Sequence, residues 1–99
     1  MNTKEIQEAL AEELEEGFQA CSIPEYMQDG MRQYVLNHIQ PGGFLTSVLE
    51  NNLIGAVKNA DHINEHRIVD YVDLVYNYVS SAAWGSPEKV QKWLGENDD

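Results

Sequence analysis

Residues 68–79 would carry apolar side chains around nearly the whole circumference of a helix. Nine of these twelve residues are apolar or tyrosine, and such a helix is normally buried on all sides. The polar residues in and just before the segment follow at intervals of four, three and four, so they share one narrow stripe: His66, Asp70, Asp73 and Asn77. We therefore expect this segment to be a central core helix or a subunit interface.

The other apolar residues also recur with the period of an α-helix. In residues 6–18 every fourth residue is apolar, and acidic residues fill the gaps. Pro24 and the pair Ser86-Pro87 are of the types that begin helices. Residues 44–57 form a further helical stretch, which an Asn-Asn pair bends or splits. Since no window alternates at period two long enough for a strand, the sequence predicts an all-α fold, a compact bundle of four to five short helices.

Length and charge indicate how the chain is organised. Its 99 residues suffice for one domain and are too few for two. Seventeen acidic residues against six basic ones give a net charge of −11, and the acids gather towards both ends. We expect a single domain composed of an acidic N-terminal helix (1–22), a helical core (23–94) and a frayed tail (95–99).

Composition argues against several classes of function. Direct binding of nucleic acid needs clustered Lys and Arg, which a chain of charge −11 does not offer. No apolar run approaches the ~18 residues of a membrane span, and no signal peptide opens the chain. The single cysteine, Cys21, cannot form an internal disulfide, which fits a reducing cytoplasm. We expect a cytoplasmic protein that has no cofactor and contacts neither nucleic acid nor a membrane directly.

One short motif matches a metal-binding pattern. His62-Ile63-Asn64-Glu65-His66 fits H-x-x-E-H, in which two histidines bind zinc and the glutamate acts as a base. Asp70, one turn further along, is the candidate third ligand. A bundle of this size offers little room for a substrate cleft, so we favour a solvated helix start in which Asp61 caps the turn and His66 pairs with Asp70. His62 and His66 remain weak metal candidates, and a small metal-dependent hydrolase is the least favoured alternative.

Several runs in the core segment form a distinctive pattern. The runs are Ile23-Pro24-x-Tyr26-Met27-x-x-Gly30, Pro41-Gly42-Gly43-Phe44-Leu45-x-x-Val48-Leu49-x-Asn51-x-Leu53, Ala60-Asp61-x-x-Asn64, Tyr76-Asn77 and Trp84-Gly85-Ser86-Pro87-Glu88-x-Val90-x-x-Trp93. Over about residues 23–94 this pattern resembles small uncharacterised proteins of tailed bacteriophages and prophages. The resemblance implies a phage accessory role in the cytoplasm of the host bacterium, and it implies no particular mechanism. The acidic first helix lies outside it.

The acidic surface supplies the leading functional hypothesis, a non-enzymatic accessory protein that binds a host or phage protein. In its most specific form the carboxylates imitate nucleic acid and occupy the basic groove of a host defence or nucleic-acid-handling complex. The candidate partner-binding residues are acids of the first helix and of the polar stripe: Glu8, Glu12, Glu15, Glu16, Asp70 and Asp73.

A homo-oligomeric structural module is the alternative from a different class. In this interpretation the apolar helix at residues 68–79 forms the subunit interface, with Tyr71 and Tyr78 as the candidate interface residues.

Overall fold

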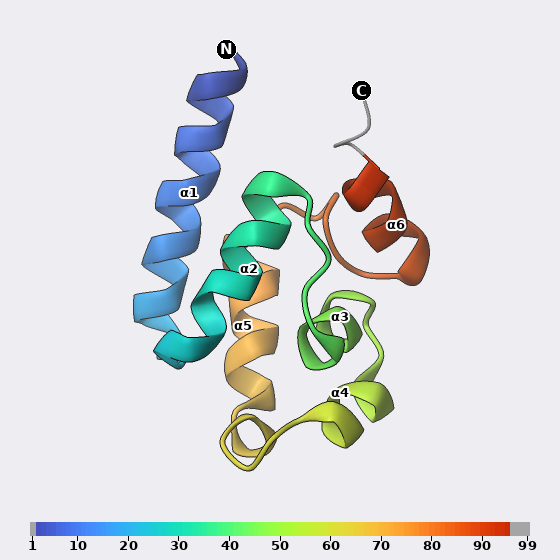
Figure 1. The fold of residues 1–99 in the computed structure, drawn as a ribbon. Helices are drawn as coiled ribbons and strands as arrows, with labels where there is room; N and C mark the ends of the chain where they lie inside the picture. The colour runs from blue at the N-terminus through green and yellow to red at the C-terminus, as the bar shows by residue number, and fades with distance from the viewer. Residues whose placement is uncertain (1, 96–99) are drawn as a thin grey trace.

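Six α-helices follow one another in a computed structural model that describes residues 2–95. They are α1 (Thr3–Ala20), α2 (Glu25–Asn37), α3 (Gly43–Leu49), α4 (Leu53–Asn59), α5 (Ile68–Tyr78) and α6 (Pro87–Gly95), with a short 3₁₀ helix, η1 (Asn64–His66), before α5 (Figure 1). No strand occurs among these residues, which confirms the all-α prediction. The expected number of four to five helices was too low.

The additional helix arises because the stretch 44–57 is split at its Asn-Asn pair. Asn51 has a φ of 62°, a left-handed conformation that lets the chain leave α3. The side chain of Asn52 accepts a hydrogen bond from the Gly55 N–H at 2.9 Å and caps α4. Asparagine suits both positions because its short polar side chain can bond to nearby backbone. Of the two outcomes left open by the sequence, a bend or a split, the structure has the split.

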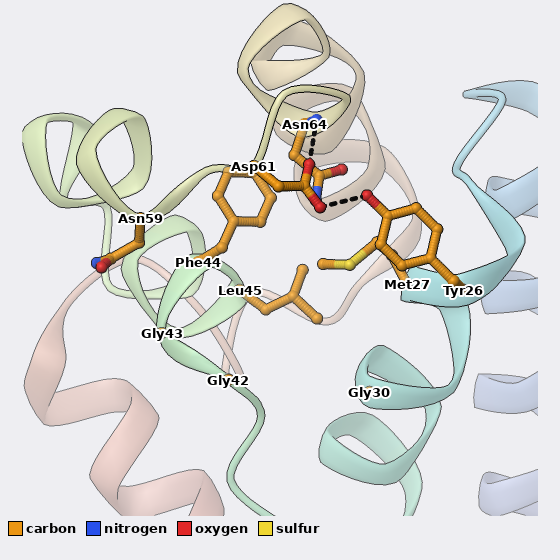
Figure 2. Close-up of a pocket in the computed structure, with 10 residues that line it drawn as sticks. All are labelled: Tyr26, Met27, Gly30, Gly42, Gly43, Phe44, Leu45, Asn59, Asp61 and Asn64. Atoms are coloured by element: carbon orange, nitrogen blue, oxygen red, sulfur yellow. Dashed lines mark hydrogen bonds between the residues drawn. The ribbon is translucent and has the colours of Figure 1, made fainter.

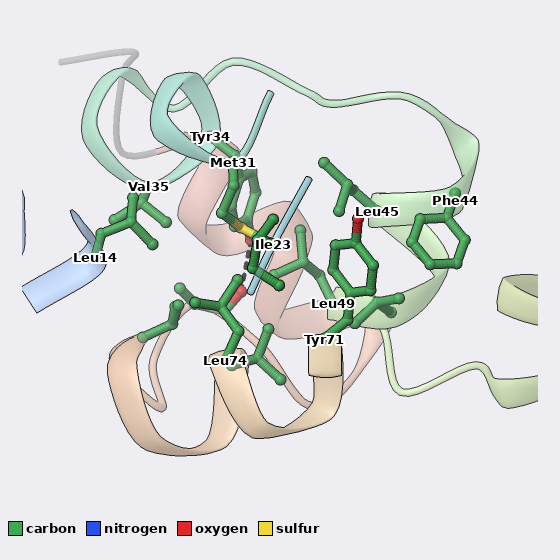
Figure 3. Packing of buried hydrophobic residues seen from close by; sticks show 14 of the residues in the cluster. Leu14, Ile23, Met31, Tyr34, Val35, Phe44, Leu45, Leu49, Tyr71 and Leu74 are labelled. Carbon is green, nitrogen blue, oxygen red and sulfur yellow. Dashed lines mark hydrogen bonds between the residues drawn. The ribbon is translucent and has the colours of Figure 1, made fainter. Parts of the chain in front are cut away.

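The hydrophobic core receives buried side chains from all six helices, and Figure 3 shows its centre. Two fully buried tyrosines lie in it, and each hydroxyl has a partner. The Tyr34 hydroxyl donates to the carbonyl oxygen of Ala83 at 2.6 Å. The Tyr71 hydroxyl donates to Oδ1 of Asn64, also at 2.6 Å. Burial raises the pKa of both phenols far above the usual value, so both stay neutral donors.

The acidic first helix is part of this core. Leu14 and Phe18 are buried, and α1 packs against both α2 and α5 (Figure 1). At Gly17 the two backbones of α1 and α5 approach so closely that an added Cβ would lie 2.6 Å from Cγ of Tyr78. The glycine is therefore needed for the contact between these helices, and α1 is fixed on the bundle.

α5 is buried on one side only, which corrects the expectation of a helix enclosed all round. Tyr71, Leu74 and Val75 face the core, whereas Val69 and Tyr76 are each 71% exposed. The reason is that α1 and α3 pack against α5 from the inner side. The candidate interface residue Tyr71 is thus fully inside the domain. Tyr78 is half-buried and lies against Gly17 of α1, so neither tyrosine is placed on the open face of the helix.

The C-terminal helix is held to the end of α2. Nε1 of Trp93 donates to the backbone oxygen of Tyr34 at 3.0 Å. Nδ1 of His38, the left-handed residue that ends α2, lies 2.7 Å from the backbone oxygen of Trp93. Gly95 is the last residue of α6, and residues 96–99 of the expected tail lie outside the described residues. Among residues 2–95, no helix has both the length and the apolar character needed to cross a membrane.

Candidate functional site

A cleft of about 350 Å³ opens between α2, the start of α3 and the segment that joins α4 to η1 (Figure 2). This volume lies at the lower end of the range of small-molecule sites, about 300–1,000 Å³. Its lining combines an apolar floor with polar groups at one edge: Tyr26, Met27, Gly30, Gly42, Gly43, Phe44, Leu45, Asn59, Asp61 and Asn64.

Asp61 is the charged residue of this lining, and hydrogen bonds hold its carboxylate in place. One oxygen, Oδ1, accepts from the N–H groups of Ile63 at 3.0 Å and Asn64 at 2.7 Å. The other, Oδ2, accepts from the hydroxyl of Tyr26 at 2.5 Å. The expectation that Asp61 caps this turn is therefore confirmed. The Tyr26 hydroxyl, together with the backbone donors, lowers the pKa of Asp61 below its usual value, so the group is ionised at neutral pH.

A chain of hydrogen bonds connects this edge of the cleft to the core. Asn64 is buried, and its Oδ1 accepts from the buried Tyr71 hydroxyl. The backbone N–H of Asn64 donates to Oδ1 of Asp61 at 2.7 Å, and Oδ2 of Asp61 accepts from the hydroxyl of Tyr26. Tyr26 is exposed, but its hydroxyl is thereby fixed in position. The orientation of the Asp61 carboxylate thus depends on a network that begins inside the bundle.

The glycines around the cleft differ in what they permit. A Cβ at Gly30 would lie 3.2 Å from Cδ1 of Leu45, and one at Gly43 would lie 3.5 Å from Cγ of Asn59. At Gly42, by contrast, a Cβ would meet nothing within 4 Å. The backbone of Gly42 has φ −66° and ψ 175°, which any residue adopts. Neither packing nor backbone conformation therefore requires glycine at this edge of the cleft.

The cleft was not predicted from the sequence, although its residues had been noted for another reason. Except for Asn59, every lining residue belongs to the runs that carry the resemblance. The structure brings three of these runs together, the first from α2, the second from the start of α3 and the third from the segment before η1. The pattern of these runs was the only indication of the cleft in the sequence, and a linear sequence does not show that the three runs meet.

The two histidines and Glu65 of the H-x-x-E-H motif lie outside the cleft, on the surface. Both histidines face the same oxygen of Glu65, with Nδ1 of His62 at 3.2 Å and Nε2 of His66 at 3.4 Å. The expected pair of His66 with Asp70 is wrong, because Asp70 lies 3.3 Å from Nη1 of Arg67. Within residues 2–95, no three His, Cys, Asp or Glu side chains come together as a metal site would require.

The acidic residues of α1 form a stripe opposite its buried face. At 100° per residue, Glu5, Glu8, Glu12 and Glu16 fall within one quarter of the helix circumference, and all four are exposed. Glu15 lies at the edge of this stripe, about 20° from Glu8, but its charge is paired. It forms a two-pronged ion pair with Arg32, in which Nε and Nη2 of the guanidinium donate at 2.6 and 2.9 Å.

A second surface feature is apolar. Six large side chains project from the outer sides of α4 and α5, and we call them the α4–α5 surface: Leu53, Ile54, Val57, Val69, Val72 and Tyr76. Leu53 and Val72 border a shallow hollow of about 60 Å³ between the two helices, and Ala56 and Ile68 also line it. Of the two candidate acids on α5, Asp73 is exposed and Asp70 is paired with Arg67.

Comparisons with protein-family models, with curated proteins and with solved structures gave no match to this chain.

Proposed function

We propose that this protein acts without catalysis, by binding another protein through the α4–α5 surface. The observation that supports this proposal is the exposure of large apolar side chains on two consecutive helices. Val69, Val72 and Tyr76 share one face of α5, and Val72 borders a hollow together with Leu53 of α4. Ile54 is 72% exposed, and Val69 and Tyr76 are 71% exposed. Isolated apolar residues are common on protein surfaces, but a continuous group of them is typical of interaction sites.

The charge of the chain favours one kind of partner. A second copy would bring a further charge of −11 to the interface, and self-repulsion opposes such an association. A partner with basic residues around an apolar patch is attracted instead. The homo-oligomeric module is accordingly the less favoured of the two interpretations. A host or phage protein in a bacterial cytoplasm remains part of the proposal because of the resemblance described above.

The test compares two variants of the tagged protein in a bacterial lysate. Leu53→Gln combined with Val69→Gln removes apolar area from the α4–α5 surface at positions that are 65% and 71% exposed. The matched control, Ile6→Gln combined with Ile39→Gln, removes apolar residues that are 46% and 51% exposed elsewhere. Circular dichroism first establishes that both variants are folded.

The proposal requires a protein that stays bound through a high-salt wash to the wild type and to the control, and that the α4–α5 variant fails to retain. Identical sets of retained proteins for all three forms contradict it. If the wild type sediments as a dimer and only the α4–α5 variant as a monomer, the homo-oligomeric interpretation is correct instead.

The acidic stripe of α1 favours a second candidate function, the imitation of nucleic acid. Glu5 and Glu16 are separated by eleven residues, or about 16 Å of helix. With Glu8 and Glu12 between them, the four carboxylates of the stripe follow at about 5.5 Å on average along the axis, compared with ~3.4 Å per charge of one DNA strand. Such a line of charge suits the basic groove of a nucleic-acid-binding protein.

Charge reversal separates this function from a general effect of acidity. Glu8, Glu12 and Glu16 are changed to Lys, and Glu15 is kept because it holds Arg32. The control reverses three exposed acids on other helices: Glu25, Asp29 and Glu88. Imitation of nucleic acid predicts a basic partner that is released by salt and lost only in the α1 variant. If both variants lose the basic partner to the same extent, net charge alone is responsible for the binding.

A further inference from the structure

The cleft between α2 and α3 has a chemistry that the proposed protein-binding surface does not use. It combines one fixed carboxylate, one exposed aromatic ring and an apolar floor (Figure 2). We propose that this cleft binds an organic cation, a guanidinium or ammonium group on an apolar stem, with the charged head at Asp61 and the stem over Met27 and Leu45. This inference goes beyond the proposed function and does not depend on the α4–α5 surface.

The head group is selected by the charge of Asp61. Within residues 2–95 this carboxylate forms no ion pair, since the four pairs present involve Glu15, Glu65 and Asp70 as the acids. A carboxylate offers about four acceptor positions, and the bonds from Tyr26, Ile63 and Asn64 use three. One position is left for a donor from a ligand. The charge repels phosphates and carboxylates, so anionic ligands are excluded.

The aromatic wall gives the cation a second contact. The Tyr26 side chain is 56% exposed, and its hydroxyl bond to Asp61 fixes the ring beside the carboxylate. A planar guanidinium can stack on such a ring while it donates to an adjacent carboxylate, and an ammonium gains a cation–π contact. Neither contact requires the ring to move, so little ordering is needed when the ligand binds.

The floor accommodates the stem. In Figure 2 the side chains of Met27 and Leu45 point into the space between α2 and α3, beneath the hydrogen bond from Tyr26 to Asp61. Leu45 is buried and Met27 is partly buried, so the surface they offer is apolar and firmly packed. Methionine in particular adapts its shape to flexible aliphatic groups.

The edge of the cleft is kept open by Gly42. Since a Cβ there would meet no protein atom within 4 Å and the backbone conformation suits any residue, the protein fold does not explain the glycine. Gly42 lines the cleft, and the space around the position of its absent Cβ is open. A larger residue at position 42 is therefore expected to narrow the cleft without disturbing the bundle.

The direct test titrates the full chain with butylguanidinium and, as a neutral isostere, with butylurea. Binding is followed through the backbone ¹H–¹⁵N signals in NMR. The proposal predicts shifts at Gly43, Ile63 and Asn64 with butylguanidinium at millimolar concentrations and far smaller shifts with butylurea. Equal effects of the two probes, or no shift at these amides with either, overturn the proposal.

Two variants and one control show whether the cleft is responsible. Asp61→Asn keeps an oxygen that can accept from Ile63 and Asn64 but removes the charge, and it should weaken binding about five- to tenfold. Gly42→Val fills the edge of the cleft and should abolish binding. Glu12→Gln removes the same charge from the exposed face of α1 and should leave binding unchanged. If Glu12→Gln weakens binding as much as Asp61→Asn does, the cation associates with the acidic surface as a whole, and the proposal is wrong.

The cationic group could belong to a free small molecule or to a side chain of another protein. A pentapeptide with one central arginine among glycines is compared with butylguanidinium, and its glutamine analogue is the control. Tighter binding of the arginine peptide indicates a side chain of a partner protein, whereas tighter binding of butylguanidinium indicates a free small molecule. Both results support the cleft as the site. Failure of both cationic probes to shift the cleft amides overturns it.

Discussion

The close contact between α1 and α5 predicts opposite effects for two glycine substitutions. Gly17 and Gly30 both lie inside helices, so alanine at either position gains about 1 kcal/mol in helix propensity. At Gly17 the new Cβ would lie 2.6 and 2.7 Å from Cγ and Cβ of Tyr78. At Gly30 its nearest neighbour is Cδ1 of Leu45 at 3.2 Å, the far end of a flexible side chain. Both variants thus gain the same helix propensity, and they differ in the steric cost of the added Cβ.

The size of the difference follows from which atoms must move. Cβ of Tyr78 is fixed to the backbone and cannot rotate away from the added Cβ at 2.7 Å, so α1 must shift outwards from α5. Overpacking of this kind costs typically about 1–3 kcal/mol, and we take the upper part of that range. After the gain in propensity, Gly17→Ala should lower the free energy of unfolding by about 1–2 kcal/mol. Gly30→Ala needs only a small rotation of Leu45 and should leave stability unchanged or raise it by up to about 1 kcal/mol.

Urea and thermal unfolding, followed by circular dichroism, measure both values. For a domain of this size, a loss of about 1–2 kcal/mol corresponds to a fall in Tm of roughly 4–16 °C. Double substitution adds the two effects, because the sites are on different helices and have different neighbours. If Gly17→Ala proves as stable as Gly30→Ala, α1 does not approach α5 as closely as described, and the reasoning fails.

Three further predictions concern hydrogen bonds and ionisable groups. Tyr71→Phe leaves the buried Oδ1 of Asn64 without its donor and should cost about 1–3 kcal/mol in urea unfolding; stability equal to the wild type would contradict the buried network. The pKa of Asp61 is lowered from 3.8, first by the Tyr26 hydroxyl, so its contribution to stability is present above this value and lost as pH falls through the lower folded pKa. The urea midpoint should therefore fall in that acidic window for the wild type and less for Asp61→Asn, and parallel curves would refute the assignment. Burial raises the pKa of Cys21, so iodoacetamide should modify it more slowly in the folded protein than in urea, as mass spectrometry can measure.

Much of the fold could be predicted from the sequence, because the residues that indicate a helix and its ends are close together in the chain. The apolar period of α1 and the prolines at the starts of α2 and α6 depend on neighbours within one or two turns. Asp61 could likewise be recognised as a cap, because its partners are two and three residues away. The exposure of one side of α5 could not be predicted, because the identity of an apolar residue does not reveal whether a neighbouring helix covers it.

The cleft could not be predicted from the sequence for a related reason. Its central hydrogen bond joins Tyr26 to Asp61 across 35 residues, and each residue alone has an ordinary surface role. Nothing in the local sequence of either one specifies that the start of α2 lies beside the segment between α4 and η1. The two histidines show the converse, since a short local pattern matched a metal-binding motif that we did not favour, and the structure directs both side chains to Glu65.

The bond between Trp93 and α2 has a consequence for how the chain folds as it is translated. Trp93 donates to the carbonyl of Tyr34 across 59 residues, which a ribosome adds in about 3–12 s at ~5–20 residues per second. Ala83, the acceptor for the Tyr34 hydroxyl, also emerges late, 49 residues after Tyr34. During those seconds α1 is already available to pack against α2, but Ala83 and Trp93 have not yet been made. The part of α2 that they cover is therefore open to solvent and chaperones. The bundle is therefore completed only after α6 has left the ribosome.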